Sequence, residues 1–191
     1  MENKVLVETS AHHLHLTKEH LAILFGEGYE LTPKKPLTQP GQFASVEKVE
    51  VIGPKRSLGK ISVLGPIRPY TQVELSMTDA RSIGVPSVVR MSGDLDGTPG
   101  CKLVGPKGEL EIDKGVIVAK RHVHFTLEDG EKFGVKDRQI ISIKIESPER
   151  SAILGDVICR VSKTAGTACH LDTDEANDCG CAGDVYCEII K

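Results

Sequence analysis

Short runs in which apolar and polar residues alternate recur along most of the chain. The segment Lys4–Thr9, "KVLVET", is the first of them. A period of two is typical of strands with one buried face. Glycine and proline turns separate the runs, which excludes long helices and favours small sheets or barrels. Further strands are predicted at Ser45–Lys55, Leu58–Arg68, Tyr70–Ser76, Cys101–Ile112, Gly115–Phe125, Gln139–Ser147 and Ala152–Ser162.

One segment has the pattern of a short helix instead. In "LTKEHLAILFG", Thr17 is a suitable N-cap, Glu19 lies in the first turn and Gly26 is a suitable stop. The sequence therefore predicts a helix of two to three turns directly after the first strands.

Composition narrows the class of protein. The 191 residues include no Trp and only 4% aromatic residues, so the core is expected to consist of strands rich in Val, Ile and Leu. A net charge of −3 gives no reason to expect a nucleic-acid partner, although it leaves room for a small anionic ligand. No run approaches the ~18 apolar residues of a membrane span, and the N-terminus lacks the pattern of a secretory signal. A cytoplasmic protein without a membrane partner is predicted.

The six cysteines are expected to be reduced thiols. Three of them lie in "CGCAGDVYC" near the C-terminus, where Cys-x-Cys is a poor match to the spacing of structural zinc sites. We expect these three cysteines to lie in a tail close to solvent.

A short motif occurs twice. "HHLHLTKEHLAILFG" near the N-terminus and "RHVHFTLEDGEKFG" about 109 residues later both read His-x-His, apolar residue, Thr and, two further on, Glu. Each copy predicts a strand followed by an N-capped short helix. The duplication therefore indicates two related halves, each a small β unit with a helical cap. The aligned pairs are His13/His122, His15/His124, Leu16/Phe125, Thr17/Thr126 and Glu19/Glu128.

The paired histidines are candidate metal ligands. Residues two apart on a strand face the same side, so each His-x-His presents two imidazoles together, a usual half-site for zinc or a similar transition metal. The alternative is an ordinary polar strand face. Duplication favours the metal interpretation.

Each pair requires a further ligand. Glu74 shares a strand face with Gln72 and Ser76 in "YTQVELS", although a solvated face would show the same pattern. His170 in "ACHLDTDEAN" either completes the second pair or caps the following acidic run. That run lacks the spacing and glycine of a calcium loop and is expected to start a helix.

Five segments together resemble the PduL-type phosphate propanoyltransferase (phosphotransacylase) family in order and spacing, over about Val5–Asn177. They are "S-x-x-H-x-H-L", "VLGPIRPYTQVELSMTDA", "RMSGDLDGTPGCKLVGPKG", "GVIVAKRHVHFTLED" and "HLDTDEAN". The resemblance implies a mainly β fold of two small β-barrel domains with short α-helical caps. One barrel is expected to comprise residues 12–119, and the other residues 1–11 plus 120–191.

The resemblance also implies ligands and roles. Two zinc ions, or other divalent transition metals, are expected, with Arg68 and Ser92 handling phosphate as the catalytic pair. Arg121 and His12 are expected to contact phosphate or coenzyme A, although His12 stands where the family usually has Arg. The implied metal ligands are His13, His15 and Glu74 for one ion and His122, His124 and His170 for the other.

The implied reaction is the reversible conversion of short-chain acyl-CoA (propanoyl or acetyl) and phosphate to acyl phosphate and CoA, by direct phosphate attack at a two-metal site. Such an enzyme is expected to be a homodimer in propanediol, ethanolamine or fermentative metabolism. No N-terminal extension of the kind that targets microcompartments is evident before the first motif. Two alternatives remain open: a dinuclear metal-dependent thioesterase or phosphatase, and a non-catalytic zinc-stabilised binding module.

Overall fold

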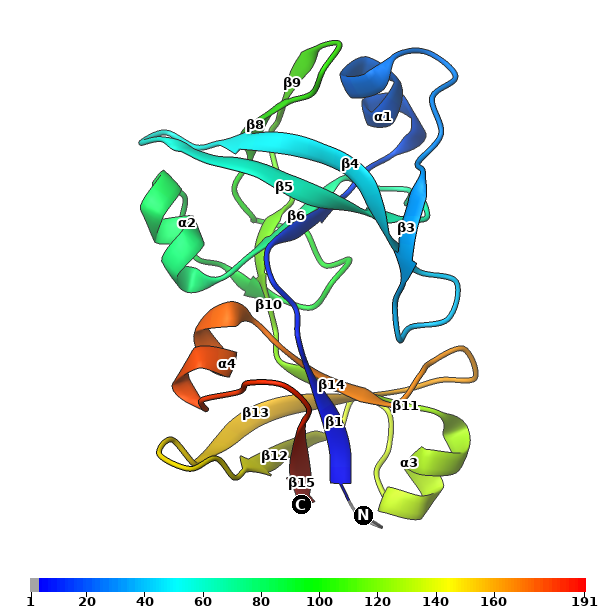
Figure 1. The fold of residues 1–191 in the computed structure, drawn as a ribbon, viewed down its shortest axis with the longest axis vertical. Helices are drawn as coiled ribbons and strands as arrows, with labels where there is room; N and C mark the ends of the chain where they lie inside the picture. The colour runs from blue at the N-terminus through cyan, green and yellow to red at the C-terminus, as the bar shows by residue number, and fades with distance from the viewer. Residues whose placement is uncertain (1–3) are drawn as a thin grey trace. The chain divides into compact units, whose positions relative to one another are not determined.

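The structure, a computed structural model, describes residues 4–191 and separates into two compact units (Figure 1). The barrel unit comprises the described residues up to Ser10 together with Thr38–Pro40 and Lys120–Lys191. The sheet unit comprises Ala11–Leu37 and Gly41–Ala119. The barrel unit is therefore assembled from segments that are distant in the sequence, whereas the sheet unit is interrupted only by Thr38–Pro40.

Strands of the barrel unit form a closed ring in the order β1-β14-β11-β13-β12-β15. The first strand, β1, closes it by pairing in parallel with β14 and antiparallel with β15. Closure leaves no unpaired strand edge. The elements are β1 (Lys4–Thr9), β11 (His122–Phe125), α3 (Leu127–Phe133), β12 (Ile140–Ile145), β13 (Ala152–Val161), β14 (Ala168–Leu171), α4 (Thr173–Asp178) and β15 (Val185–Ile190).

Strands of the sheet unit form a curled, open sheet in the order β7-β10-β6-β2-β5-β4-β8-β9, with β3 paired to β4. The elements are β2 (His13–His15), α1 (Lys18–Phe25), β3 (Pro33–Pro36), β4 (Phe43–Ile52), β5 (Ser57–Gly65), β6 (Gln72–Leu75), α2 (Met77–Ile83), β7 (Val89–Arg90), β8 (Cys101–Val104), β9 (Glu109–Ile112) and β10 (Val116–Ala119). The predicted mainly β fold with short helical caps is confirmed: one unit is a closed barrel and the other a curled half-barrel.

Alternation in the sequence explains which faces are buried. In β4, Val49 and Val51 are fully buried while Lys48 is exposed, as a strand with one face toward the core requires. Each unit has its own hydrophobic core. Leu14, Leu16, Ile61 and Leu103 are among the residues of the sheet core, and Val123, Phe125, Ile143 and Ile145 among those of the barrel core.

The two units repeat one arrangement of strands. In the sheet unit, β2 lies between β5, which is parallel to it, and β6, which is antiparallel. In the barrel unit, β11 lies in the same way between β13 and β14. A further strand extends each set in parallel, β10 beside β6 and β1 beside β14. The duplicated His-x-His motif therefore occupies the same central strand in both units.

The predicted helix after the first motif is confirmed as α1. The Thr17 side chain accepts a hydrogen bond from the backbone N–H of His20 (3.1 Å), and the Gly26 N–H donates to the carbonyl of Ala22. In the second copy, Thr126 caps α3 and Gly134 ends it in the left-handed region with φ 60°. The acidic run begins a helix as predicted, because Asp172 caps α4.

Three predictions about local structure are corrected. The cysteine-containing C-terminal segment is not a tail close to solvent: β15 is a barrel strand, and Cys179 and Cys187 are fully buried. The predicted strand Gly115–Phe125 is in fact two strands, β10 and β11, which belong to different units. The predicted strand Cys101–Ile112 is also two strands, because β8 and β9 form an antiparallel hairpin. The first two errors have one cause: these segments pair with strands that are distant in the sequence, and their own residues do not show that pairing.

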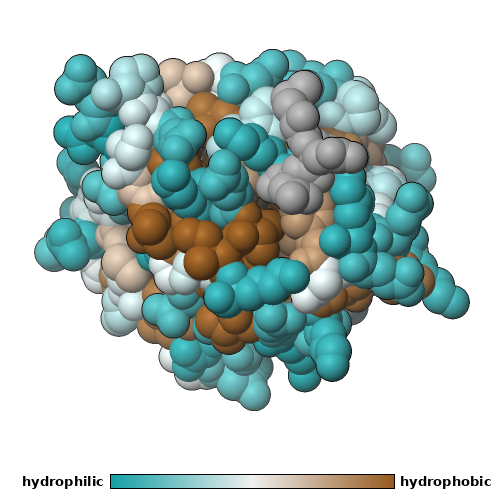
Figure 2. All heavy atoms as spheres, turned by 90° about the horizontal axis from the view of Figure 1, so that it is seen from below, coloured by the Kyte–Doolittle hydropathy of each residue, from teal (hydrophilic) through white to brown (hydrophobic). Residues whose placement is uncertain are grey.

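On the face drawn in Figure 2, hydrophobic side chains gather in a brown group among hydrophilic ones. Large hydrophobic side chains are exposed in both units, among them Ile140 and Ile153 of the barrel unit. Within residues 4–191, every helix is too short or too polar to cross a membrane.

Candidate functional site

In the sheet unit, His13 and His15 on β2 meet Glu74 on β6. His13 lies directly opposite Glu74 in the antiparallel pair. His13 Nε2 is 3.4 Å from Glu74 Oε2, and His15 Nε2 is 4.0 Å from Glu74 Oε1. One ligand atom from each residue lies within 4.8 Å of the others. The structure thus brings together these three predicted ligands, which we call the Glu74 group.

The buried backbone orients both imidazoles of the Glu74 group. His13 Nδ1 is 2.9 Å from the carbonyl of Ala11, and His15 Nδ1 is 3.1 Å from the carbonyl of Leu64. These bonds place the proton of a neutral ring on Nδ1 and leave the Nε2 lone pair facing Glu74. A lone pair beside a carboxylate is unfavourable unless a proton or a cation lies between them. The geometry therefore suits a bound cation.

The pKa values of His13 and His15 shift in opposite directions. Burial is the largest single influence on the pKa of His13 and lowers it, but the charge of Glu74 and the hydrogen bonds to Glu74 and the Ala11 carbonyl together outweigh burial, so the net shift is upward. Burial, followed by the charges of His13 and Arg68, lowers the pKa of His15 to about 3. His15 is therefore neutral at physiological pH, the form that binds a metal.

A chain of hydrogen bonds links the predicted phosphate-binding residues to the Glu74 group. Arg68 Nη1 donates to Ser92 Oγ (3.1 Å), and Gln72 Nε2 donates both to Ser92 Oγ (2.8 Å) and to Glu74 Oε1 (2.6 Å). The backbone N–H of Gly93 donates to Gln72 Oε1 (2.8 Å). Gln72 is fully buried, so it fixes Ser92 and Glu74 relative to each other.

In the barrel unit, His122 and His124 on β11 meet His170 on β14. Their ring centroids are 4.8, 5.1 and 5.0 Å apart. His122 Nε2 and His124 Nε2 are separated by 3.1 Å, and His122 Nδ1 is 2.8 Å from the carbonyl of Lys120. The structure thus brings together the second set of three predicted ligands, which we call the His170 group.

Burial and nearby positive charge keep His124 of the His170 group neutral. Burial, followed by the charges of His122, His170 and Arg160, lowers the pKa of His124 to about 2. Arg160 lies beside His124 in the parallel pair of β11 and β13. The guanidinium of Arg160 adds a permanent cation to this side of the barrel unit.

The third ligand occupies the same place in both units. His13 is opposite Glu74, and His122 is opposite His170. The sequence holds a matching repeat, because "TQVELSMTDA" (Thr71–Ala80) aligns with "TACHLDTDEA" (Thr167–Ala176). The hydroxyls that begin these segments also have equivalent partners: Thr71 Oγ1 accepts from the backbone of Thr17, and Thr167 Oγ1 from that of Thr126.

The residues that precede the two His pairs also match. His12 Nδ1 is 3.0 Å from Asp79 Oδ2, and Arg121 Nε is 2.7 Å from Glu175 Oε1. Asp79 and Glu175 occupy the same position of the helices α2 and α4, three residues after the N-cap. His12 thus takes the place and the carboxylate partner that Arg121 has in the other unit.

The donor atoms fit divalent transition metals. Zinc bound to nitrogen at about 2.0–2.1 Å in a tetrahedron sets its ligand atoms about 3.4 Å apart. The observed separations of 3.4, 4.0 and 3.1 Å bracket that value. Both groups offer imidazole nitrogen, and one adds a carboxylate, a donor set that zinc, cobalt and iron accept. Three protein ligands leave a coordination position open, which is typical of catalytic rather than structural sites.

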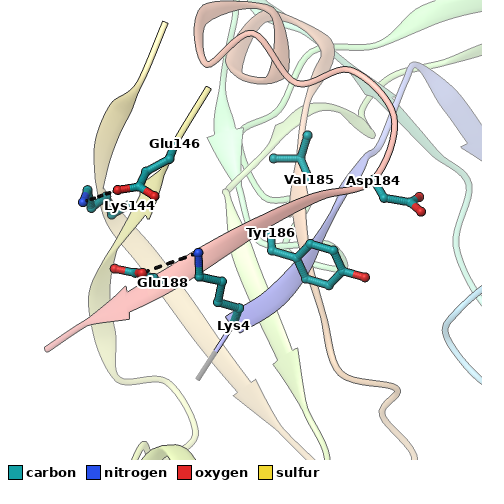
Figure 3. A pocket seen from close by; sticks show the side chains of 7 residues that line it. All are labelled: Lys4, Lys144, Glu146, Asp184, Val185, Tyr186 and Glu188. Carbon is teal, nitrogen blue, oxygen red and sulfur yellow. Dashed lines mark hydrogen bonds and ion pairs between the residues drawn. The ribbon is translucent and has the colours of Figure 1, made fainter. Parts of the chain in front are cut away.

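A hollow of about 460 Å³ on the barrel unit contains none of these residues (Figure 3). Lys4 Nζ lies 3.6 Å from Glu188 Oε1, and Lys144 Nζ lies 2.6 Å from Glu146 Oε1. Because its lysines already pair with carboxylates, the hollow is a poor site for an anion. Tyr186, Val185 and Asp184 complete its lining.

Two contacts of the groups were not among the predicted site residues. Gln72 was predicted to share a strand face with Glu74, and this spacing is the signal that could have identified it. Arg160 carries no such signal, since only the pairing of β11 with β13 places it beside His124.

Comparison with known proteins shows the family of the chain. Residues 6–182 match the family description "Phosphate propanoyltransferase". A phosphate propanoyltransferase of Leptotrichia buccalis is 53% identical over 94% of this chain and 84% of its own length. Those of Thermotoga maritima (51%; 92% and 84%) and Clostridioides difficile (47%; 97% and 88%) are also similar. The chain belongs to the phosphate propanoyltransferase family and is a phosphate acyltransferase.

Proposed function

We propose that the chain catalyses acyl-CoA + phosphate ⇌ acyl phosphate + CoA with a short acyl group such as propanoyl, and that both metal groups are required. The observation that carries the proposal is the chain of hydrogen bonds from Arg68 through Ser92 and Gln72 to Glu74. It joins an anion-binding arginine to a candidate metal ligand. The names of the relatives support propanoyl as the acyl group.

Arg68 and Ser92 bind phosphate in this proposal. Ser92 Oγ already accepts hydrogen bonds from Arg68 and Gln72, so its own O–H remains to donate to a phosphate oxygen. Arg68 uses one N–H on Ser92 and keeps further N–H groups of its planar fork for the same anion. Together they neutralise part of the charge of phosphate, which is a poor nucleophile, and orient it for attack.

The Glu74 group and the His170 group each hold one divalent metal ion. When bound, such ions supply positive charge that neutralises phosphate and polarises the thioester. The chain's own contribution is to hold the imidazoles in place: the carbonyls of Ala11, Leu64 and Lys120 lie at the Nδ1 atoms of His13, His15 and His122. His12 and Arg121 remain proposed contacts for coenzyme A. In such a contact, His12 and Arg121 use the N–H groups that are not bonded to Asp79 and Glu175.

Phosphate attacks the thioester carbonyl directly. A phosphate oxygen forms the new C–O bond, the C–S bond breaks, and its electron pair leaves with the sulfur of CoA. The cysteines support a route without an acyl-enzyme. Burial raises the pKa of Cys101 to about 12 and that of Cys159 and Cys179 to about 11, so these thiols are poor nucleophiles at neutral pH.

Release of CoA from propanoyl-CoA tests the proposal. We expect release only when phosphate and metal are both present, with acyl phosphate formed in equal amount. Arg68→Lys should raise the KM for phosphate by about 10-fold or more, because Lys cannot replace the fork. Arg138→Lys is the matched control, since Arg138 is exposed in the barrel unit. Release without phosphate would indicate a hydrolase instead, and full activity after metal removal would refute the metal requirement.

A further inference from the structure

Glu8 lies beside the third ligand of the His170 group. The strands β1 and β14 run in parallel with Glu8 opposite His170, and His170 Nε2 is 3.0 Å from Glu8 Oε2. The side chains are only 19% (His170) and 32% (Glu8) exposed. The contact is therefore partly shielded from water, where a charge-assisted hydrogen bond is strengthened.

The carboxylate of Glu8 is itself held in place. Thr38 Oγ1 donates to Glu8 Oε1. Thr38 is part of the barrel unit, and its neighbour Gln39 is buried there. Gln39 Nε2 donates a hydrogen bond to the carbonyl of Gly166 (2.8 Å), and the backbone N–H of Gly166 donates to Gln39 Oε1 (3.2 Å). One oxygen of Glu8 thus faces a fixed donor, and the other faces His170.

This contact determines which ring nitrogen of His170 is free. When Nε2–H donates to Glu8, the lone pair of the neutral ring is on Nδ1. A histidine that binds a metal usually donates its other N–H to a carboxylate or carbonyl, which fixes the ring and raises its basicity. We propose that Glu8 is a positioning residue that orients His170 to bind a metal through Nδ1. This inference rests on the metal sites of the proposed function.

The sheet unit supports the assignment by contrast. There, β10 takes the place of β1, and Ile117 lies opposite Glu74. A metal-binding carboxylate needs no hydrogen-bond acceptor behind it, whereas a histidine ligand needs one for its other N–H, and Glu8 is that acceptor for His170. Each group thus has one glutamate, as a direct ligand in one unit and behind the ligand in the other.

Titration of the metal-stripped protein with Co²⁺ tests the role of Glu8. A Glu74→Ala background removes the other group's carboxylate, so that the His170 group dominates the visible spectrum. Glu8→Ala should weaken Co²⁺ binding by about 10–100-fold. Glu8→Gln should recover part of this loss and restore the wild-type spectrum, because its carbonyl oxygen still accepts the His170 proton. Glu188→Gln, which also removes a carboxylate from the barrel unit, should change neither.

A double-mutant cycle separates positioning from direct ligation. If Glu8 acts through His170, adding Glu8→Ala to His170→Ala causes no further loss of Co²⁺ affinity. A further loss in the double variant would make Glu8 a ligand itself and overturn the proposal. So would wild-type affinity and spectrum in Glu8→Ala. These measurements do not use phosphate or propanoyl-CoA, so failure of the proposed reaction would appear separately, in the CoA-release assay.

Discussion

The Glu74 group and the His170 group stand on the same scaffold and differ in what surrounds them. In both, two histidines of a central strand face a ligand on the antiparallel neighbour. The Glu74 group is joined by hydrogen bonds to Gln72, Ser92 and Arg68, which we propose bind phosphate, whereas the residue matching Gln72 in the other unit is Ala168. The His170 group has Glu8 behind its third ligand and Arg160 beside His124. The shared strand arrangement thus sets the place of both groups, and the residues around each group differ.

Removal of one histidine from either group should have the largest effect of any variant on bound metal and on activity. His15→Ala and His124→Ala should each abolish one equivalent of tightly bound metal and lower kcat/KM by at least about 100-fold, because each leaves two protein ligands. Metal analysis beside the CoA-release assay checks both. His20→Ala is the control, since its Nδ1 bonds Thr71 Oγ1 outside both groups.

The same two variants also test whether both groups are needed for the same reaction. If His124→Ala loses its metal but keeps wild-type turnover, the His170 group is structural, and the requirement for both groups is wrong. The same result for His15→Ala would transfer the chemistry to the barrel unit.

Acid should destabilise both units of the metal-free protein. The pKa of His15 is lowered to about 3 and that of His124 to about 2, against about 6.5 in the unfolded chain. Between these values the unfolded state binds more protons, so the free energy of unfolding falls as pH falls. Each histidine contributes about 1.4 kcal/mol per pH unit. His13 acts oppositely: its pKa is raised, so its stabilisation is present below about 6.5 and is lost as pH rises through the raised value.

Urea unfolding between pH 6 and 4 measures this slope. Burial raises the pKa of Asp172 and Glu175, which offsets part of the loss, so the informative quantity is the difference between wild type and a variant. His15→Gln and His124→Gln should each reduce the slope by about 1.4 kcal/mol per pH unit. Equal slopes in wild type and both variants would show that these histidines are already protonated in the native state.

Replacement of Gln72 should disrupt only the Glu74 group. Gln72→Leu keeps the buried volume but removes the hydrogen bonds to Ser92 and Glu74, which should cost about 1–3 kcal/mol of stability. We expect the KM for phosphate to rise by about 10-fold while both metals stay bound. Thermal melts, metal analysis and phosphate titration check this. Loss of the metal from Gln72→Leu would mean that Gln72 mainly supports Glu74 rather than Ser92.

The paired histidines of both groups could be predicted from the sequence alone, because the period of two in a strand places His13 beside His15 and His122 beside His124 in any surroundings. The third ligands required more. Glu74 and His170 lie 59 and 46 residues from their nearest paired histidines, and only strand pairing brings them together. Local sequence cannot report such pairing. The same limit explains why the barrel strand β15 was predicted as a tail.

The smallest effect is expected where His12 replaces the arginine of the other unit. His12→Arg should stay within about 1 kcal/mol of wild type, because the pair with Asp79 is partly exposed (40% for His12) and its charge is screened. Arg121→His should cost more, since it also loses the bond from Nη1 to the carbonyl of Gly155 and leaves the more buried Glu175 without a permanent cation. Urea unfolding of the two reciprocal variants, together with their KM for propanoyl-CoA, measures this. If both swaps raise that KM equally without a change in stability, these positions contact coenzyme A and their ion pairs are secondary. If only stability changes, and mainly in Arg121→His, these ion pairs hold α2 and α4 against the strands that carry the proposed metal ligands.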